Sequence, residues 1–176
     1  VSLTDKQTYV FSSADFGFYE TIDSPPHAFQ SVTITTLPLS GQLTLDGVAI
    51  SLGASISLAD LNAGKLVFTP AANAASAPNT DFTFQVRDDG GTAAGGVNLD
   101  ASPNTFSFNV SLVNDPPVNT LPTGLQTNSY SPIDFALLST LISSADPDHL
   151  DSARQIDTVV LSVLKGTLSV TAGTGV

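Results

Sequence analysis

The stretches "DFTFQVR" (81–87) and "TFSFNVSLV" (105–113) decide the fold, because both alternate apolar and polar residues. In the first stretch, Phe82, Phe84 and Val86 fall on one face of an extended chain. A period of two residues is typical of a β-strand that has one buried face and one solvent face. Both stretches therefore predict half-buried antiparallel strands.

The same style continues toward the amino terminus in "SVTITTL" (31–37), "GQLTLDGVAI" (41–50) and "GKLVFTP" (64–70). Gly, Pro, Asn and Asp separate these runs and mark turns between strands. The spacing predicts an all-β chain folded as a β-sandwich. One short exception, "SLADLNAG" (57–64), predicts a single helical turn with Ser57 as its amino-terminal cap.

Composition narrows the function classes. The chain has 176 residues, of which 16 are acidic and 5 are basic, giving a net charge of −11. This balance disfavours nucleic acids and anionic membranes as partners, and it permits cations. Cysteine is absent, which excludes disulfides and thiolate metal sites. No apolar run is long enough to predict a membrane-spanning helix.

A weak internal repeat links two distant segments. "TITTLPLSGQLTLDG" (33–47) resembles "TVVLSVLKGTLSVTAG" (158–173), with Gly41 matching Gly166 at an offset of 166 − 41 = 125 residues. Self-similarity at a fixed period is typical of tandem repeats. We therefore predict that the same supersecondary unit occurs twice.

The repeat sets the expected domain boundaries. We predict one complete sandwich over 1–113, followed over 114–176 by a linker and the amino-terminal part of a second, similar sandwich. We interpret the chain as a piece of a longer protein, in which the second copy is cut off about halfway. A half sandwich would have exposed apolar edges, so it would be partly disordered or would pair with another chain.

Acidic residues gather at the predicted strand ends and turns. Asn114 and Asp115 fall between the two predicted domains, and Pro116 and Pro117 restrict the linker that follows. A hard divalent cation takes about six to eight oxygen ligands from carboxylates, amides and carbonyls. A cation would relieve repulsion between clustered carboxylates and stiffen the joint. The alternative is that each Asp is simply a turn residue, since Asp is common in turns.

Other residue patterns in the sequence give little evidence for a zinc, catalytic or sugar-binding site. The two histidines, His27 and His149, lie in Pro- or Asp-rich loops at equivalent places in the two repeats. This placement favours a shared loop geometry over a pair of zinc ligands. No nucleophile elbow and no phosphate-binding loop is present in the sequence. With no Trp and three Tyr, a sugar-stacking platform is poorly supplied. We therefore predict that the chain is not an enzyme.

The order of motifs resembles a known family. The segments "ADFGFYETIDSPPHAFQSVTITTLPLSGQLTLDGVAI" (14–50), "DFTFQVRDDGGT" (81–92) and "FSFNVSLVNDPPVNTLP" (106–122) are similar to the cadherin-like repeats of very large bacterial surface adhesins of the RTX type. Those repeats are related to the repeats of the chondroitin sulfate proteoglycan ectodomain. The resemblance implies an Ig-like or cadherin-like antiparallel β-sandwich, strung in series outside a Gram-negative cell or released from it.

The resemblance also implies calcium between neighbouring repeats, and it assigns two sets of metal ligands. The set at the joint is Asp5, Asn114, Asp115, Asp146 and Asp148. The set at the other end of the first domain is Glu20, Asp23 and Asp88. Two departures stand against the family pattern, because Ile22 replaces an expected acid in the second set and Ser129 replaces one in the second repeat.

The expected function is a non-catalytic structural and adhesive repeat of an extracellular bacterial protein, secreted or on the cell surface, with calcium stiffening the joint. Its expected partners are neighbouring repeats of the same chain, and a host or surface glycan or protein. The alternative is a carbohydrate- or ligand-binding module that uses calcium or the tyrosines Tyr9, Tyr19 and Tyr130.

Overall fold

A computed structural model describes residues 1–19, 25–73, 79–121, 143–145, 160, 162 and 164–167 of the chain. The chain divides into two compact units, Val1–Asp115 (unit 1) and Pro116–Val176 (unit 2). Strands dominate the described residues, which contain almost no helix, so the predicted β-rich fold is confirmed for this part of the chain.

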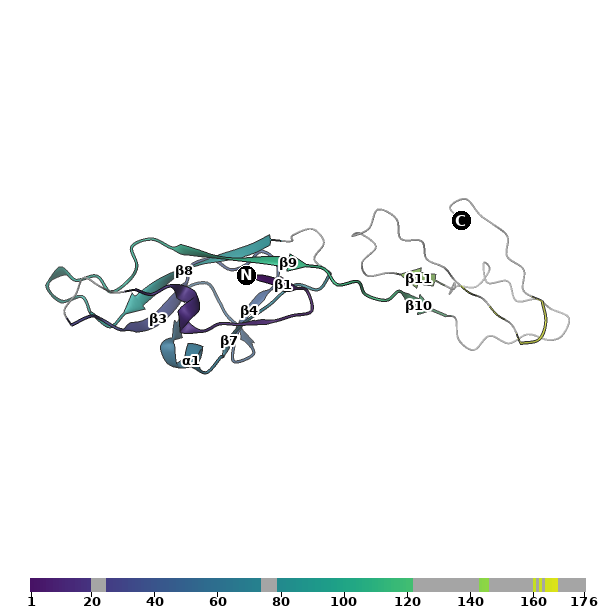
Figure 1. The fold of residues 1–176 in the computed structure, drawn as a ribbon, viewed down its shortest axis with the longest axis horizontal. Helices are drawn as coiled ribbons and strands as arrows, with labels where there is room; N and C mark the ends of the chain where they lie inside the picture. The colour runs from purple at the N-terminus through teal and green to yellow at the C-terminus, as the bar shows by residue number, and fades with distance from the viewer. Residues whose placement is uncertain are drawn as a thin grey trace. The chain divides into compact units, whose positions relative to one another are not determined.

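Unit 1 consists of two sheets (Figure 1). The five-stranded sheet has the order β1 (Ser2–Thr4), β9 (Asn104–Ser111), β8 (Asn79–Asp88), β3 (Phe29–Ile34), β6 (Ser55–Ser57). The four-stranded sheet has the order β2 (Tyr9–Val10), β7 (Leu66–Thr69), β4 (Gln42–Leu45), β5 (Val48–Ala49). The predicted strand over 41–50 is thus a hairpin, and Asp46 and Gly47 turn it with φ values of 52° and 78°. An Asp-Gly pair with positive φ is typical of such tight hairpin turns.

The central strands pair as the alternation predicts. β8 and β9 run antiparallel and side by side, with Phe82 opposite Phe106 (Figure 1). One pair departs from the antiparallel prediction, because β1 runs parallel to β9 with Leu3 opposite Val110. The ladder extends past β1, since the Asp5 amide donates to the carbonyl of Ser111 at 2.9 Å. A parallel pair needs a long connection, and β1 and β9 are separated by most of unit 1.

Helices are short. The 3₁₀ helices are η1 (Ser13–Phe16) and η2 (Ala93–Gly95), and α1 spans Leu58–Asn62. The predicted helical turn over 57–64 is confirmed, because Ser57 Oγ accepts a hydrogen bond from the Asp60 amide at 3.1 Å. Among the described helices, none has the length and apolar character needed to cross a membrane.

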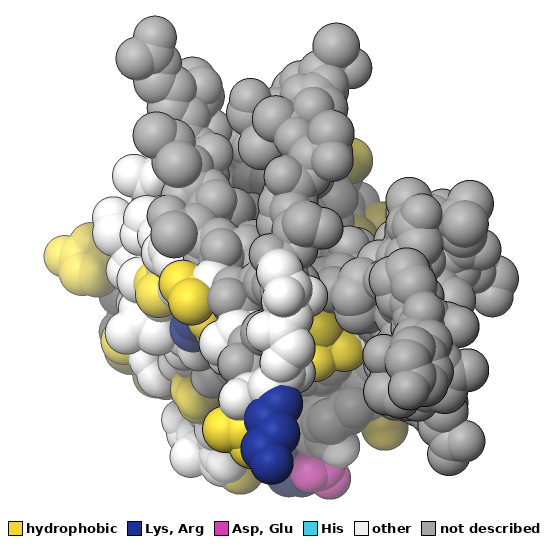
Figure 2. Space-filling view, turned by 90° about the vertical axis from the view of Figure 1, so that its right-hand side faces the viewer, with side chains coloured by type: hydrophobic (Ala, Val, Ile, Leu, Met, Phe, Trp, Pro, Cys, Tyr) yellow, Lys and Arg dark blue, Asp and Glu magenta, His cyan; other side chains and the backbone are white. Residues whose placement is uncertain are grey.

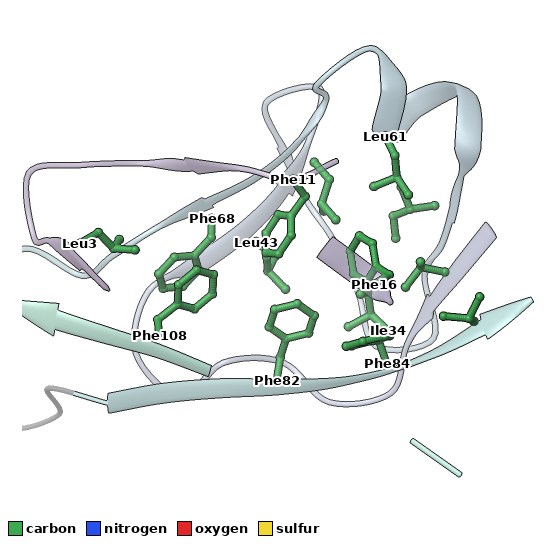
Figure 3. Close-up of a cluster of buried hydrophobic side chains, with 14 of the residues drawn as sticks. Leu3, Phe11, Phe16, Ile34, Leu43, Leu61, Phe68, Phe82, Phe84 and Phe108 are labelled. Carbon is green, nitrogen blue, oxygen red and sulfur yellow. The ribbon is translucent and has the colours of Figure 1, made fainter. Parts of the chain in front are cut away.

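The apolar faces of the two sheets share one core (Figure 3). Phe68 of β7 stacks on Phe108 of β9 with ring centroids 4.0 Å apart, and both side chains are fully buried. Phe11 packs edge-on against Phe82 at 5.7 Å. Burial of each such ring stabilises the fold by about 1.5–3 kcal/mol. Two sheets joined by one core are consistent with a β-sandwich.

Unit 2 contains one described strand pair. β10 (Val118–Thr120) runs antiparallel to β11 (Ser143–Ala145), with Val118 opposite Ala145. The predicted ligands Asp146 and Asp148 lie outside the described residues, and so does Ser129.

Candidate functional site

Asp5 directly follows β1, and its side chain has no solvent exposure. The carboxylate accepts two backbone hydrogen bonds, from the Val113 amide to Oδ1 at 3.0 Å and from the Asn73 amide to Oδ2 at 3.4 Å. Burying a carboxylate is costly unless such bonds compensate for lost water. Asp5 therefore ties together the start of unit 1, the connection between β7 and β8, and the segment that follows β9.

Lys6 places one ammonium group next to two of the predicted ligands. Its Nζ lies 2.5 Å from Asp115 Oδ2 and 3.6 Å from Asp5 Oδ2. The Asp115 side chain is 26% exposed and that of Lys6 is 41% exposed. The structure thus brings Asp5 and Asp115 to one place, with a positively charged side chain at that place. We call Asp5, Lys6 and Asp115 the Lys6 cluster.

Asn114 lies beside the cluster on the surface. Its Nδ2 donates to the backbone carbonyl of Asp115 at 3.0 Å, so this side chain lies along the chain that leaves unit 1. Three members of the predicted joint set, Asp5, Asn114 and Asp115, are therefore close in the fold.

The fit of this cluster to calcium is incomplete. Calcium takes about six to eight oxygen ligands, and the described side chains here are two carboxylates and the Asn114 amide, together with an ammonium. Among the residues that the structure describes, no group of three His, Cys, Asp or Glu side chains could hold a metal ion. The described part of the site fits an ammonium better than a divalent cation.

Asp88, the described member of the second predicted set, lies at the other end of the sheet. Asp88 ends β8, where Phe84 lies opposite Asn104 at the start of β9. Asp5, in contrast, hydrogen-bonds to Ser111 at the end of β9. Asp88 and Asp5 therefore lie toward opposite ends of the five-stranded sheet. Glu20 and Asp23 lie outside the described residues.

Asp88 lines a surface pocket of about 250 Å³. Its Oδ1 accepts a hydrogen bond from the Gly90 amide at 2.8 Å, which fixes the turn after β8. Asp100 lines the same pocket, and its Oδ1 accepts from the Ser102 amide at 3.2 Å. The remaining lining residues are Phe16, Gly17, Phe18, Tyr19, Val86 and Asn104.

The tyrosines of the alternative interpretation differ in their surroundings. Tyr9 packs against Phe11 with ring centroids 4.9 Å apart, and its hydroxyl donates to Asp15 Oδ1 at 2.6 Å. Burial, followed by this hydrogen bond and the Asp15 charge, raises the pKa of Tyr9 to about 12. Tyr9 is therefore partly buried against the core, whereas Tyr19 is 83% exposed beside the pocket. Tyr130 lies outside the described residues.

The ligand sets predicted from the sequence omit Lys6 and Asp100. A usable signal for Lys6 was its position, since it is one of 5 basic residues and directly follows a predicted metal ligand. Asp100 lies in the connection between β8 and β9. It lines the same pocket as Asp88 only because of the path that this long connection takes. No local pattern carries this information.

His27 takes part in packing. Its ring lies so close to Gly90 that a Cβ there would meet His27 Nδ1 at 2.4 Å. This contact places the turn that follows β8 against the residues that precede β3. His149, the other member of the zinc interpretation, lies outside the described residues.

Figure 2 shows described hydrophobic side chains in separate spots on one face of the molecule, with few acidic side chains among them.

Comparisons with protein-family models, curated proteins and solved structures found no match. The function is therefore inferred from the residues and contacts of the chain itself.

Proposed function

We propose that the chain is a non-catalytic structural and adhesive repeat of a large extracellular bacterial protein. Its repeating unit would be an Ig-like or cadherin-like sandwich. The resemblance of 1–122 to adhesin repeats supports this proposal, and so do the two sheets that share one core in unit 1.

The observation that carries the proposal is the parallel pairing of β1 with β9, the first and last strands of unit 1. Because the two strands are parallel, the chain enters β1 at one end of the pair and leaves β9 at the opposite end. Tension applied through the two chain ends therefore loads the β1–β9 hydrogen bonds in shear, so that these bonds resist together. This geometry suits a unit that transmits force along a series of repeats.

A second observation supports the tandem arrangement. Gly41 and Gly166, which the internal repeat aligns, have φ values of 91° and 109°. Positive φ is a conformation that favours glycine. Glycine thus stands at both aligned positions in a conformation that favours it, as a tandem repeat would require.

A cation belongs to the proposal because two carboxylates meet where the chain leaves unit 1. Calcium at this joint stays a prediction of the sequence. To bind between Asp5 and Asp115, calcium would have to displace the Lys6 ammonium. Its further ligands would come from Asp146 and Asp148, as the family resemblance implies.

The direction of loading provides the test. Because the chain lacks cysteine, pairs of cysteines can be introduced as unique attachment points for single-molecule stretching. One variant is pulled by the ends of the full chain. The other is pulled across the five-stranded sheet, through cysteines at the exposed positions Ser2 of β1 and Ser55 of β6. We expect a higher unfolding force for end-to-end pulling, and equal forces in both directions would refute a tension-bearing role.

The surface pocket favours a second candidate function, a carbohydrate- or ligand-binding module. An exposed aromatic ring, Tyr19, borders a pocket that also holds Asp88, Asp100 and Asn104. Aromatic faces combined with a few polar groups are typical of small-ligand sites. Glycan-array binding that Tyr19→Ala abolishes and Tyr9→Phe preserves would favour this candidate.

A further inference from the structure

We infer that the Lys6 ammonium is the resident cation of the Lys6 cluster and makes this end of unit 1 independent of divalent cations. The inference rests on the proposed function only in taking the cluster as the place where a cation is needed. It reverses the expectation that calcium performs this task in this chain.

The geometry supplies the first argument. Lys6 Nζ is 2.5 Å from an oxygen of Asp115, which is about the distance at which calcium itself would lie from that oxygen. A divalent ion shared by Asp5 and Asp115 would therefore overlap with the ammonium and be repelled by its charge.

Burial supplies the second argument. The Asp5 side chain has no solvent exposure, and each of its oxygens already accepts a backbone amide hydrogen bond. The ammonium 3.6 Å away adds the opposite charge that a buried carboxylate needs. Asp5 thus has its hydrogen bonds and its counter-charge from the chain itself.

Covalent linkage supplies the third argument. Lys6 is the residue next to Asp5, so its ammonium is always present at high effective concentration. A free cation must pay the entropy of association and must also displace this side chain. The ammonium should therefore remain between Asp5 and Asp115 when calcium is present at millimolar concentrations.

A matched control exists in the same unit. Lys65 Nζ lies 2.7 Å from Asp60 Oδ1, and the two side chains are 40% and 29% exposed. These exposures are close to the 41% and 26% of Lys6 and Asp115. Lys65→Gln therefore removes a similar ion pair away from the Lys6 cluster.

The experiment compares thermal unfolding of the full chain as wild type, Lys6→Gln and Lys65→Gln, in chelator and in about 1 mM calcium chloride. For wild type and Lys65→Gln, we expect calcium to raise Tm by less than about 1 °C. For Lys6→Gln, we expect a lower Tm in chelator and a rise of about 3 °C or more with calcium. A calcium response of Lys6→Gln no larger than that of wild type would overturn the inference.

A second measurement does not depend on how well the variant folds. In wild type labelled with ¹⁵N at lysine, the Lys6 ammonium resonance should stay unchanged as calcium is added. A calcium-dependent shift of that resonance at about millimolar calcium would show displacement and overturn the inference. The stretching experiment is independent of both measurements. If the unfolding force still depends on the pulling direction but the calcium measurements differ from these expectations, this inference alone is contradicted. If the calcium measurements agree but the unfolding force is equal in both directions, the proposed function alone is contradicted.

Discussion

The rings of Phe68 and Phe108 stack with their planes 10° from parallel, one from each sheet of unit 1. This contact joins β7 to β9 within the core, as Figure 3 shows. Because β9 also pairs with β1, the packing of this one strand links the core to the place where tension would enter.

Phe108→Ala should lower the free energy of unfolding by about 3–5 kcal/mol, because it removes a fully buried ring and leaves a cavity against Phe68. Urea denaturation measures the change. Val48→Ala is the control, since Val48 is 70% exposed, and it should change the free energy by less than about 0.5 kcal/mol. Equal effects of the two substitutions would mean that the shared core is wrongly assigned.

Gly41→Ala should be more destabilising than Gly47→Ala. Both glycines have positive φ, so both substitutions carry a conformational cost of about 1–2 kcal/mol. Only at Gly41 would the new Cβ meet other atoms, lying 2.7 Å from the Phe68 ring and 2.7 Å from the Thr69 carbonyl. Overpacking of this kind adds about 1–3 kcal/mol, which the difference between the two unfolding free energies would measure. An equal loss at both positions would contradict the close approach of Gly41 to β7.

Stability should fall as the pH rises from about 10 toward 12. The pKa of Tyr9 is raised from its ordinary 10.0 to about 12 in the folded chain. The contribution of Tyr9 is therefore complete below the unfolded pKa, and it is lost as pH passes through this window because unfolding then releases the phenolic proton. Tyr9→Phe should remove this part of the pH dependence, measured by urea unfolding at several alkaline pH values. Parallel pH profiles for the variant and wild type would contradict the assignment.

Asp5→Ala should be much more harmful than Asp115→Ala. The first substitution leaves the amides of Val113 and Asn73 without their acceptor at a partly buried place, which costs up to about 1–3 kcal/mol for each unsatisfied group. The second breaks a partly exposed ion pair with Lys6, worth about 0–1 kcal/mol. Chemical denaturation of both variants gives the comparison. A larger loss at Asp115 would show that the ion pair, and not the buried carboxylate, organises the Lys6 cluster.

The period of two residues was sufficient to predict β3, β4, β7, β8 and β9, because burial of one face imposes it directly on the sequence. Phe82, Phe84 and Val86 all lie on the buried side of β8. Ser57 was likewise predictable as a helix cap, since its bond to the Asp60 amide spans three residues. The alternation and the helix cap both depend on residues close together in the sequence, so the sequence alone was enough to predict them.

The long-range relationships could not be predicted in the same way. Nothing in residues 2–4 indicates that β1 pairs in parallel with β9, because the partner lies about a hundred positions away and either direction would bury Leu3. The approach of Lys6 to both Asp5 and Asp115 depends on that pairing. The family resemblance predicted Asp5 and Asp115 as ligands of one metal ion, and it offered no reason to expect a lysine between them.

The central claim is that the β1–β9 pair carries tension along the chain. Two leucine-to-alanine substitutions test it most directly, since Leu3 lies in β1 and Leu61 lies in α1, and both are buried. Each should cost about 2–5 kcal/mol in the free energy of unfolding. For an equal loss of that free energy, end-to-end stretching of the full chain should show a greater fall in unfolding force for Leu3→Ala than for Leu61→Ala. A fall that is equal, or greater for Leu61→Ala, would contradict the claim.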